Sequence, residues 1–125
     1  IQYLWRKKLM NEIEKIEKPW GYEVIWAKTE NYSAKFLHIN PNSRLSLQYH
    51  KEKEETLYVM AGNLTFQLGE SDEETVTGPG SIIHVEPGII HRFGAGNQPV
   101  MLCEVSTSEL DDVVRLEDDY KRVQK

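Results

Sequence analysis

The segment Arg44-Leu45-Ser46-Leu47-Gln48-Tyr49-His50 decides the fold of this chain. Side chains alternate between the two faces of a β-strand, so residues 44–50 are predicted to form a strand with one polar and one apolar face. The polar face carries Arg44, Ser46, Gln48 and His50, and the apolar face carries Leu45, Leu47 and Tyr49. The polar face either lies in water or lines a site inside a closed sheet, and this segment alone favours neither.

Short runs rich in β-branched and aromatic residues make up most of the chain, separated by turn clusters such as Ala61-Gly62-Asn63. They predict strands over residues 22–27, 33–39, 44–50, 55–61, 63–68, 74–77, 81–86 and 99–106. Many short strands with regular turns are typical of an antiparallel sandwich or barrel. Residues 11–18 predict a short helix or a frayed arm, and residues 108–121 a helix that Ser108 caps.

The composition indicates one globular domain of 125 residues. The chain has 15 Lys and Arg against 20 Asp and Glu, a net charge of −5, which argues against nucleic-acid binding because that needs a basic face. Its one cysteine excludes an internal disulfide. No apolar run approaches the ~20 residues that a bilayer requires, so we expect no membrane partner and a cytoplasmic location. Met10 is a candidate natural start, with residues 1–9 upstream of it.

A set of metal ligands is the strongest chemical signal in the sequence. Glu55 shares the face of its predicted strand with Leu57 and Val59, where a carboxylate is costly unless it is paired or bound to a cation. His91 alone, after the Pro87-Gly88 turn, is better explained as a loop histidine in water. If these strands are neighbours in a closed barrel, two oxygen and two nitrogen ligands for one divalent cation converge: Gln48, His50, Glu55 and His91.

These residues resemble the cupin motifs. Residues 42–62 are similar to the first motif through Asn42, Gln48, His50, Glu55 and Gly62, and residues 80–91 are similar to the second through Gly80, Gly88 and His91. A longer resemblance, to the cupin domain of type II mannose-6-phosphate isomerases, is carried by residues 18–24, 44–50, 87–92 and 111–122. Asn42 stands where the motif usually has glycine, which a left-handed turn tolerates.

The resemblance implies an all-β, double-stranded β-helix fold (a cupin, or jelly-roll barrel) with a short helical or irregular C-terminal tail. The expected organisation is an N-terminal arm over residues 1–18, a cupin barrel over 19–107 and a C-terminal segment over 108–125 that packs on the barrel. One divalent metal ion is expected, zinc first, with iron, manganese, nickel or cobalt as alternatives.

The implied activity is a metal-dependent isomerisation of mannose 6-phosphate and fructose 6-phosphate by proton transfer through an enediol or enediolate. The base is either a metal-bound hydroxide or an uncoordinated side chain, for which Lys35 is the candidate. We expect Arg44 and Arg115 to bind the phosphate, with Arg115 also counted as catalytic. Lys51 and Lys53, in a stretch where the family typically has histidine and arginine, are interpreted as a solvated turn. The alternatives are another cupin enzyme, an epimerase or dioxygenase, and a non-catalytic cupin that binds a sugar or nucleotide sugar.

A homodimer is expected from the same strand. If Gln48 and His50 face the barrel interior, then Leu45, Leu47 and Tyr49 face outward and form an apolar patch of the kind that marks an interface. The alternative is that residues 11–26 fold back over this patch.

Overall fold

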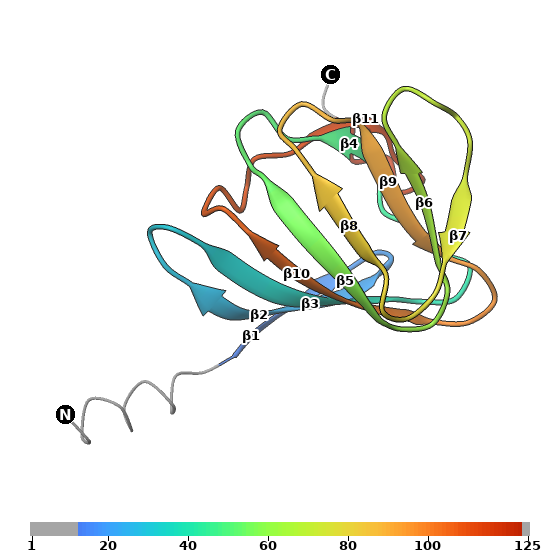
Figure 1. The fold of residues 1–125 in the computed structure, drawn as a ribbon, viewed down its shortest axis with the longest axis horizontal. Coiled ribbons are helices and arrows are strands. Elements are labelled where there is room, and N and C mark those ends of the chain that lie inside the picture. Colours follow the sequence, from blue (N-terminus) through green and yellow to red (C-terminus); the bar gives the residue numbers. More distant parts are fainter. Residues whose placement is uncertain (1–12, 124–125) are drawn as a thin grey trace.

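The computed structural model describes residues 13–123, and its eleven strands form two antiparallel sheets (Figure 1). The six-stranded sheet has the order β1 (Glu14–Lys18), β2 (Gly21–Lys28), β3 (Ser33–Ile39), β10 (Val100–Ser106), β5 (Glu55–Ala61) and β8 (Ile82–Val85). The five-stranded sheet has the order β11 (Val114–Glu117), β4 (Leu47–Tyr49), β9 (His91–Ala95), β6 (Leu64–Leu68) and β7 (Thr75–Thr77). No helix among residues 13–123 has the length and apolar character that crossing a membrane requires.

The two sheets enclose a core that is apolar at one end and charged at the other. Leu57, Val59, Val100 and Leu102 are fully or almost fully buried on the inner face of β5 and β10. Further along the same inner faces, the buried residues are charged or polar instead: Glu55 on β5, Lys35 on β3 and Glu104 on β10. The apolar end holds the sheets together by burying side chains worth roughly 1.5–3 kcal/mol each, which leaves the other end free for a site.

The expected all-β double-stranded β-helix architecture is confirmed. The predicted strands 33–39 and 55–61 coincide with β3 and β5, and β2, β6, β7, β8 and β10 match their predictions to within one residue at each end. Three strands were missed, namely β1, β9 and β11. Asn42 has a φ of 56°, as the predicted left-handed turn requires.

The predicted strand over residues 44–50 is too long, and the faces assigned to its first residues are wrong. Only Leu47–Tyr49 forms β4, and Arg44 makes an isolated bridge to Gly94. Leu45 and Gln48, three residues apart, line the same cavity, so strict alternation is broken between them. As a result Leu45 is buried in the core and Arg44 turns to the outside, where it pairs with Asp119.

The helix predicted over residues 108–121 is wrong, and residues 14–18 form neither the short helix nor the frayed arm that was expected of them. Residues 14–18 pair with β2 as an edge strand, while residues 11 and 12 lie outside the described part of the chain. Residues 108–121 form turns and then β11, which pairs with β4. The Asp112 carboxylate accepts hydrogen bonds from the backbone N–H groups of the loop that follows β4, so this segment binds the barrel instead of coiling on itself.

The argument for a dimer through Leu45, Leu47 and Tyr49 therefore fails, because these residues do not form an outward apolar row. Leu45 belongs to the core, and Leu47 and Tyr49 are half-buried in β4 beside β11. Of the segment expected as the alternative cover, Trp20 shares the buried core cluster with Leu45, whereas β1 and β2 lie in the other sheet.

The tail is fixed to the barrel by an ion pair with a defined pH dependence. Arg44 Nε donates to Asp119 Oδ2 over 2.7 Å, and this hydrogen bond holds the pKa of Asp119 below its ordinary value of 3.8. A carboxylate with a lowered pKa stabilises the fold fully above its unfolded pKa and loses that effect as the pH falls through the folded pKa.

We therefore expect Asp119→Asn to lower the free energy of unfolding at pH 6 by on the order of 0.5–1 kcal/mol, since both partners are about half exposed. The difference from the native chain should shrink between pH 4 and pH 3. Urea unfolding at the three pH values measures it. A difference that is constant from pH 6 to pH 3 would contradict the ion pair.

Candidate metal centre

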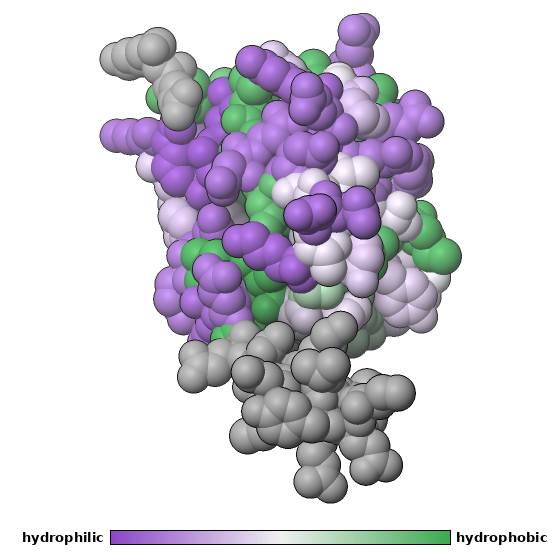
Figure 2. Space-filling model, turned by 90° about the vertical axis from the view of Figure 1, so that its left-hand side faces the viewer, coloured by the Kyte–Doolittle hydropathy of each residue, from purple (hydrophilic) through white to green (hydrophobic). Residues whose placement is uncertain are grey.

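A cavity of about 320 Å³ opens at the charged end of the barrel. Seen from that side, hydrophilic residues surround a strip of hydrophobic ones (Figure 2). Trp20, Leu37 and Phe93 form apolar parts of the wall, whereas the remainder is dominated by charged side chains. Six basic and five acidic residues line the cavity, a formal charge of +1 in a chain of net charge −5, so the cavity is locally more positive than the molecule.

Three buried side chains gather at one wall of this cavity: His50 and Glu55 line it, and His91 contacts Glu55 and is itself fully buried. His50 directly follows β4, Glu55 begins β5 and His91 begins β9. Glu55 Oε1 lies 3.3 Å from His50 Nε2 and 3.1 Å from His91 Nε2. One ligand atom from each residue lies within 4.8 Å of the other two, which is close enough for one metal ion.

The hydrogen bonds of the two imidazoles show that this cluster needs either extra protons or a metal ion. His91 Nδ1 lies 2.9 Å from the carbonyl oxygen of Ile89, and His50 Nδ1 contacts the carbonyl oxygen of Asp112. A carbonyl only accepts, so each Nδ1 carries the proton and each Nε2 of a neutral ring presents a lone pair. His91 Nε2 is buried and makes no hydrogen bond. Two lone pairs then face one carboxylate, and either extra protons or a metal ion must lie between them.

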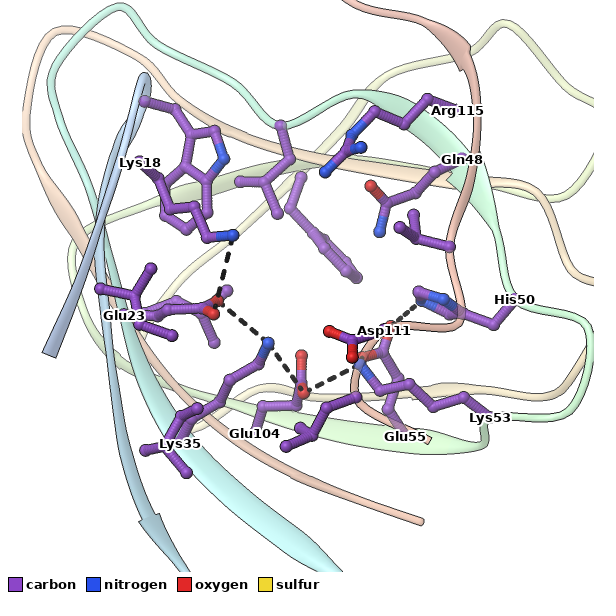
Figure 3. A pocket seen from close by; sticks show the side chains of 18 of the residues that line it. Lys18, Glu23, Lys35, Gln48, His50, Lys53, Glu55, Glu104, Asp111 and Arg115 are labelled. Atoms are coloured by element: carbon purple, nitrogen blue, oxygen red, sulfur yellow. Dashed lines mark hydrogen bonds and ion pairs between the residues drawn. The ribbon is translucent and has the colours of Figure 1, made fainter. Parts of the chain in front are cut away.

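Gln48 and Arg115 extend the cluster along the same wall. Gln48 is the cross-strand partner of His91 in β9 and of Arg115 in β11, so these three residues form a row over three strands. Figure 3 shows Gln48 and Arg115 pointing into the cavity above His50. The Gln48 Oε1 atom accepts a hydrogen bond of 2.6 Å from Ser46, so an amide rotation would be needed for that oxygen to reach a metal.

A chain of alternating charges runs from Glu55 of this cluster across the inner face of the six-stranded sheet (Figure 3). Lys53 Nζ lies 3.3 Å from Glu55 Oε2 and 3.3 Å from Glu104 Oε2. Lys35 Nζ continues the chain, 3.8 Å from Glu104 and 3.0 Å from Glu23. Each buried charge is thus paired on both sides, which offsets the cost of removing it from water.

The pKa values of the buried acids differ because their neighbours differ. Burial opposes ionisation of Glu55, but hydrogen bonds donated by His50 and His91, when each carries the extra proton on Nε2, and the charge of Lys53 outweigh it and hold the pKa of Glu55 well below its usual range. Burial and the charge of Glu55 raise the pKa of Glu104 to about 7, against the effect of Lys35 and Lys53. The two carboxylates therefore have different affinities for a proton.

The structure brings the predicted ligands His50, Glu55 and His91 together and places Gln48, Lys35 and Arg115 in the same cavity wall. It does not place Arg44 there: the guanidinium pairs with Asp119 outside the cavity, so a phosphate role for Arg44 is not supported.

The prediction that Lys53 lies in a solvated turn is wrong. Lys53 is 3% exposed and forms ion pairs with Glu55 and Glu104. Glu23, Glu104 and Asp111 also line the cavity without having been predicted. The alternation of Glu104 with apolar neighbours in residues 100–106 is the one sequence signal that marks a buried acid there.

Comparison with known proteins identifies the family. Residues 6–118 match the family model described as mannose-6-phosphate isomerase C-terminal. This chain belongs to that family. The match covers the barrel, the cavity and most of the C-terminal segment.

Curated relatives of this family include longer proteins. The chain is 35% identical over 113 residues to mannose-1-phosphate guanylyltransferase ManC of Salmonella typhimurium, which covers 86% of this chain and 23% of ManC. It is 30% identical over 112 residues to xanthan biosynthesis protein XanB of Xanthomonas campestris, which covers 86% of this chain and 24% of XanB. The chain thus spans about a quarter of the length of these relatives.

A solved structure supports the fold. An uncharacterised Klebsiella pneumoniae protein with a double-stranded β-helix domain superposes with a TM-score of 0.67 at 19% identity, over 84% of this chain and 86% of that one.

We expect His50→Ala and His91→Ala each to weaken binding of Zn²⁺ or Co²⁺ by more than about 100-fold, since loss of even an outer partner of a metal ligand costs 10–100-fold. Competition with a chromophoric chelator measures the affinity. His84→Ala is the matched control, because His84 is a half-exposed histidine that pairs with Glu54. Equal affinities for all three variants and the native chain would rule out the cluster as the metal site.

Proposed function

We propose that the chain is a metal-dependent aldose–ketose isomerase that interconverts mannose 6-phosphate and fructose 6-phosphate in the cytoplasm. The observation that carries the proposal is the row of Arg115, Gln48 and His91, which sets a cavity-lining guanidinium beside the metal-ligand cluster. An open-chain sugar phosphate has an anion at one end and a carbonyl at the other, which matches this arrangement.

Arg115 is suited to hold the phosphate. Its Nε is buried and has no hydrogen-bond partner among residues 13–123. Burial and the nearby charge of Arg122 lower the pKa of Arg115, and the charge of Asp118 only partly offsets them. A bound anion would stabilise this guanidinium, and its planar donors fit phosphate oxygens.

The metal cluster is suited to the carbonyl end of the substrate. A bound divalent ion supplies a Lewis acid that polarises the carbonyl and favours the enediolate. His50, Glu55 and His91 would hold it, with Gln48 as a fourth ligand after its amide rotates. Two imidazoles and a carboxylate suit zinc, and iron, manganese, nickel and cobalt accept the same donors. Lys53 takes the second oxygen of Glu55 and so orients the first towards the cluster.

A second candidate function, sugar-phosphate binding without turnover, has one observation in its favour. Lys35, the expected base, already pairs with Glu23 and Glu104, and a lysine held between two carboxylates is a poor proton acceptor. The proton transfer then needs another group on the cavity wall. The relative named as a mannose-1-phosphate guanylyltransferase fits either function, because its name places it on a mannose phosphate.

An isomerase assay distinguishes the two functions. With added Zn²⁺, Mn²⁺ or Co²⁺, we expect mannose 6-phosphate to be converted to fructose 6-phosphate, followed by coupled spectrophotometry. We expect Glu55→Gln, which keeps the shape but loses the charge, to abolish turnover. Tight binding of mannose 6-phosphate by calorimetry without turnover under any metal would establish the second function instead.

Arg115→Ala is expected to weaken mannose 6-phosphate binding by about 10- to 150-fold, the equivalent of about 1.5–3 kcal/mol for a charge-assisted contact. Arg44→Ala is the matched control, since Arg44 lies outside the cavity and should leave the affinity within about twofold. Calorimetric titration of both variants measures this. If Arg44→Ala weakens binding and Arg115→Ala does not, the phosphate lies elsewhere.

A further inference from the structure

Few acidic groups in the cavity are free to move a proton. Five acidic residues line it: Glu14, Glu23, Glu55, Glu104 and Asp111. Glu55 belongs to the metal-ligand cluster, and Glu23 and Glu104 are buried and pair with Lys35. The carboxylates of Glu14 and Asp111 are exposed and make no hydrogen bond or ion pair with any other residue of the range 13–123. These two acids are therefore the candidates for proton transfer.

Glu14 lies far from the metal ligands. It begins β1 at the edge of the six-stranded sheet, and β2, β3 and β10 separate this strand from β5, where Glu55 lies. Four strand spacings of about 4.8 Å amount to roughly 19 Å along the sheet. A base must come within about 3.5 Å of the atom that it deprotonates. Asp111 is therefore the acid that remains for a substrate held at the cluster.

The C-terminal segment places Asp111 beside the metal ligands. This segment runs antiparallel to β4, with Arg115 opposite Gln48. Three residues before Arg115, the carbonyl oxygen of Asp112 contacts Nδ1 of His50. Asp111 is the next residue, with its Cα about 3.8 Å from that of Asp112. Its carboxylate points into the cavity (Figure 3).

The backbone around Asp111 is held in place. The Asp112 carboxylate accepts hydrogen bonds from three successive backbone N–H groups of the loop that follows β4. The N–H group of Val113 donates to the carbonyl oxygen of Asp111 over 3.0 Å. The segment thus fixes the position of Asp111 relative to His50 while the Asp111 carboxylate stays accessible to a substrate that enters the cavity.

We propose that Asp111 is the catalytic residue that moves the proton between the two reacting carbons, a proposal that rests on the isomerase function proposed above. The carboxylate takes a proton from C2 of open-chain mannose 6-phosphate, and the electron pair of the broken C–H bond forms a C1–C2 double bond. The carboxyl group returns the proton to C1, while the proton of the C2 hydroxyl passes to the C1 oxygen. One C–H bond breaks and one forms, so fructose 6-phosphate results without an oxidant or reductant.

The order of groups along the segment matches the order of groups in the substrate. Arg115, suited to the phosphate on C6, lies on one side of the contact between Asp112 and His50, and Asp111 lies on the other. A sugar phosphate held by Arg115 then extends past the metal ligands, with its carbonyl end towards Asp111. Because like charges repel, a carboxylate near a phosphate does not favour binding of the anion by its charge.

Steady-state isomerisation by the whole chain with added Zn²⁺, Mn²⁺ or Co²⁺ tests the proposal. We expect Asp111→Asn to lower kcat by about 100- to 10,000-fold, the usual contribution of a positioned base. The affinities for mannose 6-phosphate, by calorimetry, and for Zn²⁺, by competition with a chelator, should stay within about threefold. Glu14→Gln is the matched control, because it removes the other unpaired carboxylate of the cavity wall. It should keep kcat within about twofold.

Rescue by a small carboxylate tests the proton transfer itself. Asp111→Ala removes the carboxylate and leaves space for formate, so added formate should raise kcat of this variant by at least about tenfold. Formate should not raise the kcat of Glu55→Gln, because that variant is altered in the metal-ligand cluster.

The outcomes separate this proposal from the isomerase function. An active native chain whose kcat is unchanged in Asp111→Asn overturns the role of Asp111 and leaves the isomerase function intact, because solvent or another group then moves the proton. A loss of affinity for mannose 6-phosphate or Zn²⁺ in Asp111→Asn assigns this residue to binding and overturns the proposal, and formate without effect on Asp111→Ala overturns it too. A native chain without turnover overturns the isomerase function and this proposal with it.

Discussion

The burial of the Glu55 carboxylate is the constraint on which the rest of the site depends. A carboxylate enclosed in a barrel is costly unless both oxygens find positive or donor partners. One oxygen faces the imidazoles of His50 and His91, and the other faces Lys53. Lys53 is itself buried and forms an ion pair with Glu104. Glu104 also pairs with Lys35, and Lys35 pairs in addition with Glu23. The chain of charges ends only at Lys18, which is 27% exposed at the cavity mouth.

Sheet geometry makes such a chain feasible. Glu104 on β10 and Lys35 on β3 are cross-strand partners, so their side chains leave the sheet on the same face and beside one another. Lys53 comes from a loop rather than a strand, and three backbone hydrogen bonds to Asp112 hold that loop in place. The C-terminal segment thus determines the position of Lys53, and with it the orientation of Glu55, although it contributes none of the three clustered ligands.

The sequence predicts the strands well and the site in part, for physical reasons that particular residues show. Residues 33–39 and 55–61 alternate buried with more exposed side chains along a regular strand, so their bounds follow from the pattern. Arg44 and Leu45 were assigned to the wrong faces because the strand is irregular before Leu47, and periodicity cannot reveal an irregularity. Lys53 was missed because alternating Lys and Glu residues look the same in a solvated turn and in a buried ion-pair chain. Only tertiary contacts distinguish the two.

At the charged end of the barrel, charged side chains face inward and apolar side chains face outward, the reverse of what each side chain favours by itself. In β2, β3 and β10 the inward positions Glu23, Lys35 and Glu104 are charged, while their neighbours Val24, Phe36 and Cys103 face outward. A slip of one residue would place the charges in water and the apolar groups inside. The other end of the same strands prevents it, because the slip would expose Leu37, Ile39, Val100 and Leu102, which are buried at 0–2% exposure and are worth roughly 1.5–3 kcal/mol each. The apolar core therefore imposes the register, and the register keeps the charges of the site buried against their local tendency. Conflict between local and global preference is expected where a fold carries function, and here it is confined to the end of the barrel that holds the cavity.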